Sequence, residues 1–536
     1  MSGTAHVDSF VRDRLPPADA QPEFLFELPE LQYPEQLNAA VELMHGGAPD
    51  ALAVINDAGE WTYAEMDALS GRIARLLTEE EGLVPGNRVL LRGPNGAMLF
   101  ACWLGVLKAG GVVVATMPIL RAGEIATILE RAEVSHAIVD TRCLEDFAPA
   151  AAQAETVRSL LTYQGDARAG ALEARLADVA DGFEPVATHR DDPALIAFTS
   201  GTTGKPKGCV HYHRDILACA DGFARHVLKP EAGSRWACSA PIAFTFGLGM
   251  LLIFPWRFGG TAVTIEQPGP KALLEAVERF GVTNLATAPT AYKAMLGIAG
   301  AYDLSSLTTC VSAGEHLPAA TWEAWRAATG LRVVDGIGAT EMMHIFISAS
   351  GDDIRPGATG KAVPGYRACV LDEAGNPLAH GTGRLAVKGP TGCRYFDDPR
   401  QAVYVQGGWN VTGDTYRADE DGYFWYVARS DDMIISAGYN IAAPEVENAL
   451  YAHPAVAECA VIGVPCEERG QRVKAFVVVA SGHAAEPALA AALQEHVKRT
   501  IAPYKYPRDV EFVDALPKTA TGKLQRFALR GPKPAA

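Results

Sequence analysis

The chain has 536 residues, of which 49% are apolar and 21% charged, and its formal net charge is −16. This length exceeds what one hydrophobic core organises, so we expect a soluble globular protein of two or more domains. The acidic balance and the lack of a basic run argue against a nucleic-acid-binding surface, because nothing would neutralise the phosphates.

Cysteine spacing and the N-terminal sequence indicate the compartment. The ten cysteines form no CxxC pair or ligand-like cluster, which favours free thiols in a reducing cytosol over disulfides or a zinc site. The start of the chain, MSGTAHVDSFVRDRLPP, lacks the basic and then apolar stretches of a secretion signal. A membrane helix needs about 20 apolar residues in a row, and every apolar run in the sequence is much shorter. We therefore expect a cytoplasmic protein without a membrane partner, either a monomer or a homodimer.

Helices and strands alternate in the first part of the chain. Thr62 and Glu65 have capping-box spacing and begin a helix predicted to extend to Leu77. The alternation predicts an α/β fold with largely parallel strands that are buried on both faces. The next elements are expected at Asn87–Leu91 (strand), Met98–Lys108 (helix) and Gly111–Thr116 (strand), and the pattern recurs at Phe258–Ile265, Val277–Ala286 and Leu331–Gly336.

The residue pattern changes near Asp431, and the residues that follow have their own small set of elements. About 100 residues with a separate apolar pattern suffice for a small domain. We therefore predict a large α/β N-terminal domain at 1–430 and a small α+β C-terminal domain at 431–536. The elements expected in the small domain are a helix at Pro444–Ala452, strands at Glu458–Val464 and Val473–Val479, and a helix at Pro487–Thr500.

A segment rich in Gly, Thr and Lys, AFTSGTTGKPKGCVHYHRD at Ala197–Asp215, begins within a predicted buried strand at Ala194–Phe198. Glycines let backbone N–H groups approach a ligand, hydroxyls donate short hydrogen bonds, and lysines supply positive charge. A triphosphate needs all three, although Walker A spacing is absent. A solvated turn is the alternative for such a loop taken alone. The candidate phosphate-binding residues are Thr199, Ser200, Gly201, Thr202, Thr203 and Lys207.

Further segments of this kind follow in a fixed order. Each of them alone is a common turn or loop. Together, and over nearly the whole chain, they resemble the acyl-adenylate-forming superfamily, which joins acyl-CoA synthetases, peptide-synthetase adenylation domains and luciferases. The resemblance implies stacked α/β sheets in the large domain and a mobile small domain. The segments are SAGEHLP at 312–318, DGIGATE at 335–341, GGWNVTGDTY at 407–416, VARSDD at 427–432 and PKTATGK at 517–523.

The resemblance implies a reaction centre for ATP and Mg²⁺. An anionic acid must attack a polyanion, so positive charge has to be fixed around the phosphates. By resemblance, Thr340 touches the α-phosphate and Glu341 holds Mg²⁺. Lys523 bridges the oxygens of the acid and the α-phosphate during adenylation, a role suited to a compact cation on a flexible stem.

The resemblance also implies how the adenosine of ATP is bound. Asp335 meets the adenine amino group, and Asp414 and Arg429 meet the ribose. Many members of the superfamily have an aromatic residue at the position of Ile337, so the usual stacking on adenine is not expected here. Residues of the SAGEHLP segment cradle adenine mainly through their backbone: Gly314, Glu315 and His316.

The segment PIAFTFGLG at 241–249 indicates the class of acid. Amino-acid-activating relatives hold an aspartate here for the ammonium group, and this segment has none. This segment and TEMMHIF at 340–346 resemble the benzoate-CoA ligases, and GYNIAAPEVE at 438–447 resembles the 2-aminobenzoate-CoA ligases among them. We therefore expect a flat apolar slot for an aromatic acid. Its expected residues are Thr245, Phe246, Ile337, Gly338 and His344.

Three side chains of this slot have more than one interpretation. Thr245 or His344 could accept a hydrogen bond from an ortho-amino group of the acid. His344 could equally pack in the core and bond a backbone carbonyl. Phe246 could equally be a core residue.

The implied reaction has two steps. The acid and ATP give an aryl-AMP and pyrophosphate, and coenzyme A then attacks the acyl carbon while AMP leaves. The small domain would rotate about Asp431, withdrawing Lys523 and presenting Ser436, Gly438 and Tyr439 to CoA. The alternatives are a benzoate- or hydroxybenzoate-CoA ligase, an aryl-acid adenylating enzyme that loads a carrier protein, and a nucleotide-binding regulatory protein without turnover.

Overall fold

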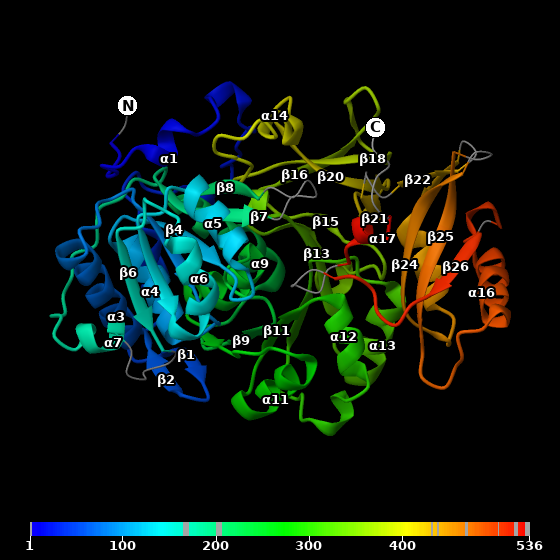
Figure 1. Ribbon diagram of the computed structural model, residues 1–536, viewed down its shortest axis with the longest axis horizontal. Helices are drawn as coiled ribbons and strands as arrows, with labels where there is room; N and C mark the ends of the chain where they lie inside the picture. The colour runs from blue at the N-terminus through cyan, green and yellow to red at the C-terminus, as the bar shows by residue number, and fades with distance from the viewer. Residues whose placement is uncertain are drawn as a thin grey trace.

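A computed structural model describes residues 3–164, 171–199, 206–429, 433–436, 439–466, 470–501, 503–518 and 524–530. The chain forms a large N-terminal domain of mixed α/β layers and a smaller C-terminal domain beside it (Figure 1). The two-part α/β architecture expected from the sequence is therefore confirmed. Asp431 lies outside the described residues, so the boundary between 430 and 431 stays a prediction.

The first sheet of the N-terminal domain contains six strands in the order β6-β5-β3-β4-β7-β8. All neighbours in it are parallel except β8, which is antiparallel to β7. Every residue of β3 and β5 is buried, as expected of parallel strands covered on both faces. The strands are β3 (Arg88–Arg92), β4 (Val112–Thr116), β5 (His136–Asp140), β6 (Ser159–Tyr163), β7 (Pro193–Thr199) and β8 (Lys207–Tyr212).

The second sheet contains nine strands in the order β15-β14-β13-β12-β11-β9-β10-β1-β2. Its central strands, from β13 to β1, are parallel, and the outer strands β2, β14 and β15 pair antiparallel. The strands are β1 (Leu52–Asn56), β2 (Gly59–Thr62), β9 (Arg235–Cys238), β10 (Thr261–Val263), β11 (Asn284–Thr287), β12 (Thr309–Ser312), β13 (Val333–Gly338), β14 (Ile345–Ser348) and β15 (Lys361–Ala362).

Helices cover both of these sheets. All twelve residues of α4 are buried, because it packs on α3 as well as on β3 and β4. Among the described residues, no helix is both long and apolar enough to span a membrane. The longer helices of this domain are α3 (Tyr63–Arg75), α4 (Ala97–Lys108), α5 (Ala122–Arg131), α6 (Leu144–Ala151), α11 (Pro270–Phe280), α12 (Pro289–Leu296) and α13 (Ala319–Thr329).

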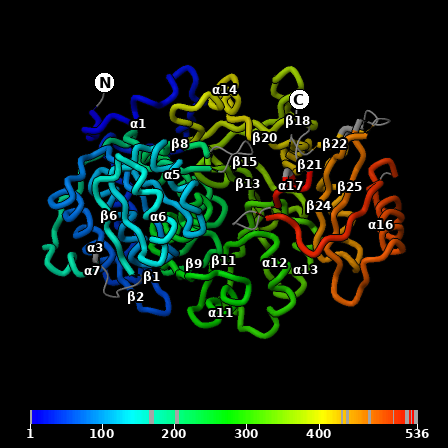
Figure 2. The backbone as a smooth tube through the Cα atoms, viewed as in Figure 1, coloured from blue at the N-terminus to red at the C-terminus, as the bar shows by residue number. Residues whose placement is uncertain are grey.

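A third, antiparallel sheet completes the N-terminal domain. Its order is β17-β16-β18-β20-β19, and β21 pairs with β20. Figure 2 shows the blue N-terminal segment extending from the first sheet to the yellow region around α14 (Gln401–Tyr404). The strands are β16 (Arg367–Leu371), β17 (Pro377–Leu378), β18 (Gly381–Lys388), β19 (Val405–Gln406), β20 (Trp409–Ala418) and β21 (Phe424–Arg429).

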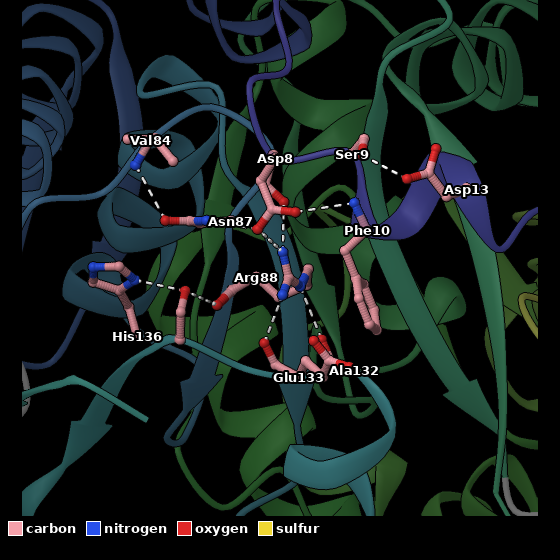
Figure 3. Close-up of polar contacts among 12 residues, drawn as sticks. Asp8, Ser9, Phe10, Asp13, Val84, Asn87, Arg88, Ala132, Glu133 and His136 are labelled. Carbon is pink, nitrogen blue, oxygen red and sulfur yellow. Dashed lines mark hydrogen bonds and ion pairs between the residues drawn. The ribbon is translucent and has the colours of Figure 1, made fainter. Parts of the chain in front are cut away.

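The contacts drawn in Figure 3 hold the start of the chain against the first sheet. Asp8 pairs with the guanidinium of Arg88 and accepts a hydrogen bond from Asn87 Nδ2 at 2.8 Å. Arg88 also donates from Nε to the carbonyl of Ala132 at 2.9 Å. The ring of Phe10 lies 4.4 Å from the same guanidinium. These contacts hold α1 (Phe10–Asp13) against the sheet.

The C-terminal domain has a sheet in the order β23-β22-β25-β24, with β26 beside β25. Two helices pack on one face of it, α15 and α16. The opposite face packs against Leu516, Leu524 and Leu529. The elements are β22 (Met433–Ser436), β23 (Tyr439–Ala442), α15 (Ala443–Tyr451), β24 (Val456–Cys466), β25 (Gly470–Val479), α16 (Pro487–Thr500), β26 (Asp509–Phe512) and α17 (Arg526–Leu529).

The predicted elements agree closely with the observed ones, apart from three differences. Within Val277–Ala286, α11 continues to Phe280 and β11 begins only at Asn284. The first helix begins at Tyr63 with the expected capping box, but continues past Leu77 as a π-helical turn to Glu80. The strand expected within Phe258–Ile265 is only β10, because Gly259 adopts a left-handed φ of 71° after the preceding helix. All ten cysteines are free thiols, as expected.

Candidate active site

The phosphate-loop segment lies between β7 and β8, which form an antiparallel hairpin in which Thr199 is opposite Lys207. The Thr199 hydroxyl oxygen is buried and has no hydrogen-bond partner among the residues that the structure describes. Such a buried hydroxyl is available to donate to a ligand. The loop residues predicted to bind phosphate, Ser200, Gly201, Thr202 and Thr203, lie outside the described residues, and so does Lys523.

Lys207, Tyr395 and Glu341 form a chain of polar contacts. Lys207 Nζ donates to the Tyr395 hydroxyl at 2.8 Å and lies 4.7 Å from the centre of that ring. The Tyr395 hydroxyl donates in turn to Glu341 Oε1. Lys207 Nζ and Glu341 Oε1 are 3.9 Å apart. The structure thus joins two predicted site residues through a tyrosine that sequence reasoning had missed.

The protonation of this group follows from its burial. Glu341 is 8% exposed and Tyr395 only 1%. Burial, and then the charge of Glu341, raise the pKa of Tyr395 far above its ordinary value. The phenol therefore stays neutral and serves as a hydrogen-bond donor to the Glu341 carboxylate, while Lys207 supplies the positive charge.

Glu341 is a suitable ligand for Mg²⁺. Its carboxylate is a hard oxygen donor that is anchored at one oxygen by Tyr395. Within the described ranges, no group of three or more His, Cys, Asp or Glu side chains is arranged to hold a metal ion. A single carboxylate is sufficient where the metal completes its coordination with water and substrate phosphates, as Mg²⁺ usually does.

A second buried network positions the backbone of Thr340, which begins a short 3₁₀ turn after β13. His211 Nε2 donates to the Thr340 carbonyl at 2.7 Å, and His211 Nδ1 lies 3.7 Å from Asp215. Arg394 donates to Asp215 at 2.6 Å and is itself fully buried. Burial opposes the charged form of His211, but the charges of Cys209 and Asp215 outweigh it and raise its pKa. The hydrogen bond from His211 Nε2 thus holds the carbonyl beside Glu341.

The predicted adenine loop follows β12. Gly314 has a left-handed φ of 90°, which favours glycine at this turn. The ring of His316 stacks on Tyr426 from β21, with ring centres 5.3 Å apart and planes 25° apart. Burial lowers the pKa of His316 to about 4, so its ring is neutral. Glu315 is half-buried in the same loop.

Asp335 lies on β13 close to this loop. Burial raises the pKa of its carboxyl well above the ordinary value, although the backbone N–H of Gly336 opposes the shift. One of its oxygens, Oδ1, is buried and has no hydrogen-bond partner within the described ranges. An oxygen without a partner costs about 1–3 kcal/mol, and an amino group of a ligand would satisfy it. The predicted role beside the adenine amino group is compatible with this.

Asp414 and Arg429, the predicted ribose residues, face each other across strands β20 and β21. Their side chains are 3.6 Å apart, and Arg429 is 48% exposed whereas Asp414 is 13% exposed. Tyr416 packs edge-on against Tyr426, with ring centres 5.5 Å apart. The contact between Tyr416 and Tyr426 thus connects the strands that bear the predicted ribose residues to the predicted adenine loop.

His344 lies in an aromatic cluster. Its ring is 4.5 Å from Phe254, 5.6 Å from Phe223 and 5.7 Å from Phe246 between centres. Its Nε2 faces the Phe246 carbonyl at 3.4 Å, and its Nδ1 is buried without a partner in the described part of the chain. Burial lowers the pKa of His344 to about 3, so the ring is neutral. Because a carbonyl only accepts, Nε2 holds the hydrogen and Nδ1 is left as an acceptor.

The other predicted slot residues lie around His344. A Cβ on Gly338 would come within 2.9 Å of the His344 backbone, so only glycine fits there without a shift. Ile337 and Phe246 are partly buried against the main core. Thr245, at 8% exposure, begins the short helix α9 (Thr245–Leu248). The structure thus brings together the residues predicted for the slot, and His344 also has the packing that the alternative interpretation expected.

The residues predicted to meet CoA lie in the C-terminal domain. Ser436 is fully buried at the end of β22 and pairs with Tyr439 across the β22/β23 turn. Gly438 and the predicted hinge Asp431 lie outside the described residues.

Sequence reasoning missed Tyr395, Tyr426 and His211. The segment RYFDDP around Tyr395 has no recognisable spacing, and its partner Glu341 is 54 residues away in the chain. His211 was within the phosphate-loop segment, and its position four residues before Asp215 was the available signal.

Two family matches cover most of the chain. Residues 44–395 match the AMP-binding enzyme family, and residues 445–523 match the AMP-binding enzyme C-terminal domain. The chain belongs to the AMP-binding enzyme family. This membership confirms the superfamily indicated by the ordered segments and its class of enzyme, the AMP-forming acid–thiol ligases.

Individual relatives span nearly the whole chain. Benzoate–CoA ligase of Thauera aromatica is 38% identical over 513 residues, which cover 94% of this chain and 97% of the relative. The crystal structure of the anthranilate CoA ligase AuaEII in complex with anthranoyl-AMP matches with a TM-score of 0.88 and 34% identity. That match covers 94% of this chain and 98% of AuaEII.

MatB from Rhodopseudomonas palustris offers a comparison between two states of one protein. The ATP-bound structure matches with a TM-score of 0.84 and 30% identity, over 92% of this chain and 98% of MatB. The apo structure matches over the same shares of both chains, at 29% identity, with a TM-score of 0.74. The chain thus superposes more closely on the ATP-bound MatB structure than on the apo structure.

Proposed function

We propose that this chain is an ATP-dependent aryl-CoA ligase that activates an aromatic carboxylic acid, with 2-aminobenzoate favoured and benzoate next. The observation that supports adenylation most is the contact chain from Lys207 through Tyr395 to Glu341. It places a cation of the phosphate-loop hairpin next to a carboxylate suited to Mg²⁺, as an attack on a polyanion requires.

In the first step, a carboxylate oxygen of the acid attacks the α-phosphorus of ATP, and the bond to the departing pyrophosphate breaks. Lys207 and the hydroxyls of the loop bind the phosphates that leave. Lys523 neutralises charge between the acid and the α-phosphate. His211 holds the Thr340 carbonyl, so that the backbone next to the α-phosphate does not have to reorganise.

Mg²⁺ would be held by Glu341 together with phosphate oxygens, and it would supply positive charge that stabilises the leaving group. The residues of the chain fix the position of that carboxylate. Tyr395 keeps one carboxylate oxygen in place, and Lys207 prevents free rotation of Tyr395 by bonding its hydroxyl.

In the second step, the thiol sulfur of CoA attacks the acyl carbon, the thiol proton is lost, and the bond to AMP breaks. The C-terminal domain rotates about Asp431 between the steps, which removes Lys523 and brings Ser436, Gly438 and Tyr439 to the thiol. The anhydride formed in the first step makes AMP a good leaving group, so little further catalysis by charged side chains is needed.

The preference for 2-aminobenzoate is supported by the unpaired acceptor of His344. Its Nδ1 is buried, and its ring is neutral, so an ortho-amino group could donate to it. A buried acceptor that gains a donor recovers about 1–3 kcal/mol. Phe246, which is partly buried beside His344, would provide an apolar wall for the acid. The relatives named for benzoate and anthranilate agree with an acid of this class.

Carrier-protein loading is the main alternative within this chemistry. A panel of acids tests both questions together: AMP formation is measured with 2-aminobenzoate, benzoate, hydroxybenzoates and short fatty acids, with and without free CoA. We expect CoA-dependent AMP release with aromatic acids, fastest with 2-aminobenzoate. AMP release that free CoA does not stimulate, or a preference for fatty acids, would contradict the proposal.

A further inference from the structure

Lys293, on α12 of the N-terminal domain, contacts the C-terminal domain. Its Nζ donates to the carbonyl of Ala457 at 3.1 Å and lies 4.3 Å from the centre of the Tyr451 ring. Ala457 is near the start of β24 and Tyr451 is at the end of α15. Figure 1 shows α12 beside β24 at this point. One lysine thus joins the two domains by a hydrogen bond and a cation–π contact.

The site of contact is connected to the chain on both sides of the 519–523 segment. Glu458, next to Ala457, pairs with Lys518 at 2.7 Å. Lys518 in turn forms a β-bridge with Leu524. Arg526 donates hydrogen bonds to Glu447 of α15, at 2.6, 2.8 and 3.3 Å. These contacts therefore link the start of β24 to Lys518 and Leu524, the described residues on either side of Lys523 in the sequence.

The face of the C-terminal sheet that bears α17 is turned toward the N-terminal domain (Figure 1). Leu524 and Leu529 pack on that face. Lys523 directly precedes Leu524 in the sequence but lies outside the described residues, and we therefore take this orientation as the one that the proposed function requires for adenylation. The closer match to ATP-bound than to apo MatB agrees with it.

The Lys293 contacts are also weak enough to let the C-terminal domain alternate between two orientations. Desolvation lowers the pKa of Lys293, while Cys459 and Glu458 oppose the shift. A hydrogen bond and a cation–π contact at a partly exposed site are individually weak. Contacts of this kind can favour one orientation without preventing rotation, and they shift the equilibrium to the extent that a second orientation does not make them.

We propose that Lys293 is a positioning residue that holds the C-terminal domain in the orientation for adenylation and has no part in thioester formation. The inference rests on the proposed function, because it assumes that Lys523 acts in the first step only.

The test measures the two half-reactions separately. The first is acid-dependent exchange between ATP and pyrophosphate, and the second is CoA-dependent consumption of supplied aryl-AMP. Lys293→Met removes both contacts, Lys293→Arg keeps a donor and a cation, and Lys271→Met is the matched control. Lys271 is an exposed lysine on α11 that pairs with Glu275 of its own helix at 3.1 Å.

We expect Lys293→Met to slow the first half-reaction about fivefold to tenfold relative to the second. Lys293→Arg should restore the ratio, and Lys271→Met should leave it unchanged. An unchanged ratio of the two rates, whether both half-reactions slow equally or neither slows, would overturn the proposal. If Lys293→Met is unstable, Lys293→Gln gives the same ratio test. A wild-type protein without acid-dependent exchange would instead refute the proposed function itself.

Discussion

The Tyr395 hydroxyl donates a hydrogen bond to Glu341 while accepting one from Lys207. The two charged residues come from different elements: Lys207 begins β8, and Glu341 lies in the turn after β13. Lys207 Nζ and Glu341 Oε1 are 3.9 Å apart. The Tyr395 hydroxyl bridges them by hydrogen bonds to both. The carboxylate therefore keeps free lone pairs on the side away from Tyr395.

Replacing Tyr395 by Phe tests this arrangement. The variant removes both hydrogen bonds but keeps the ring, so Glu341 and Lys207 are expected to form a direct ion pair. That pair would compete with Mg²⁺ and phosphate, and we expect the KM for MgATP to rise about tenfold with a smaller change in kcat. Steady-state kinetics at varied Mg²⁺ measures this. An unchanged KM for MgATP would show that the phenol does not position the carboxylate.

His344→Phe separates recognition of the ortho-amino group from packing. Phenylalanine preserves the aromatic contacts with Phe223, Phe246 and Phe254 but removes the Nδ1 acceptor. We expect the ratio of kcat/KM for 2-aminobenzoate over benzoate to fall about fivefold, since one hydrogen bond is worth about 1 kcal/mol.

Thr245→Ala is the companion variant, because Thr245 was the other candidate acceptor. If the ratio falls in Thr245→Ala and is unchanged in His344→Phe, the amino group is recognised by Thr245 and the proposal for His344 is wrong.

Buried neutral histidines predict an acid-labile fold. Burial lowers the pKa of His344 and of His213 from 6.5 to about 3 in each case. The folded state thus binds fewer protons than the unfolded state below pH 6.5. Their contribution to stability is complete above that pH and is lost as the pH falls toward 3. At pH 5.5 each histidine should cost about 1.4 kcal/mol.

Urea unfolding at pH 7.5 and 5.5, followed by tryptophan fluorescence, measures the effect. His344→Phe should reduce the difference in unfolding free energy between the two pH values by about 1.4 kcal/mol. A variant with the full wild-type difference would mean that His344 is already protonated, or exposed, in the folded protein.

Much of the fold could be predicted because its signals are local. The strand at 87–91 and the helix at 98–108 were each found within one residue of β3 and α4, since their apolar pattern is continuous. The antiparallel third sheet could not be predicted, because its short strands β17 and β19 are two residues each and their pairing depends on distant partners. Pairing of that kind is set by tertiary packing rather than by local residue preference.

The candidate site shows the same difference between local signals and contacts with distant residues. Glu341, Asp414 and Lys207 lie in recognisable segments, so residue type and order were enough to select them. Tyr395 lies in a segment without such a pattern, and its role exists only through contacts with residues 54 and 188 positions away. The acceptor of His344 likewise depends on burial and on the direction of one ring nitrogen, neither of which a motif specifies.

In the proposed mechanism, one site performs two reactions and Lys523 serves only the first. The Lys523→Ala variant tests it most directly, by the same two half-reactions in the wild-type background. We expect acid-dependent exchange between ATP and pyrophosphate to fall by about 10²–10³-fold. CoA-dependent conversion of supplied aryl-AMP should stay within about threefold of the wild type, because that step uses no lysine at the α-phosphate. Equal loss of both half-reactions would contradict the account.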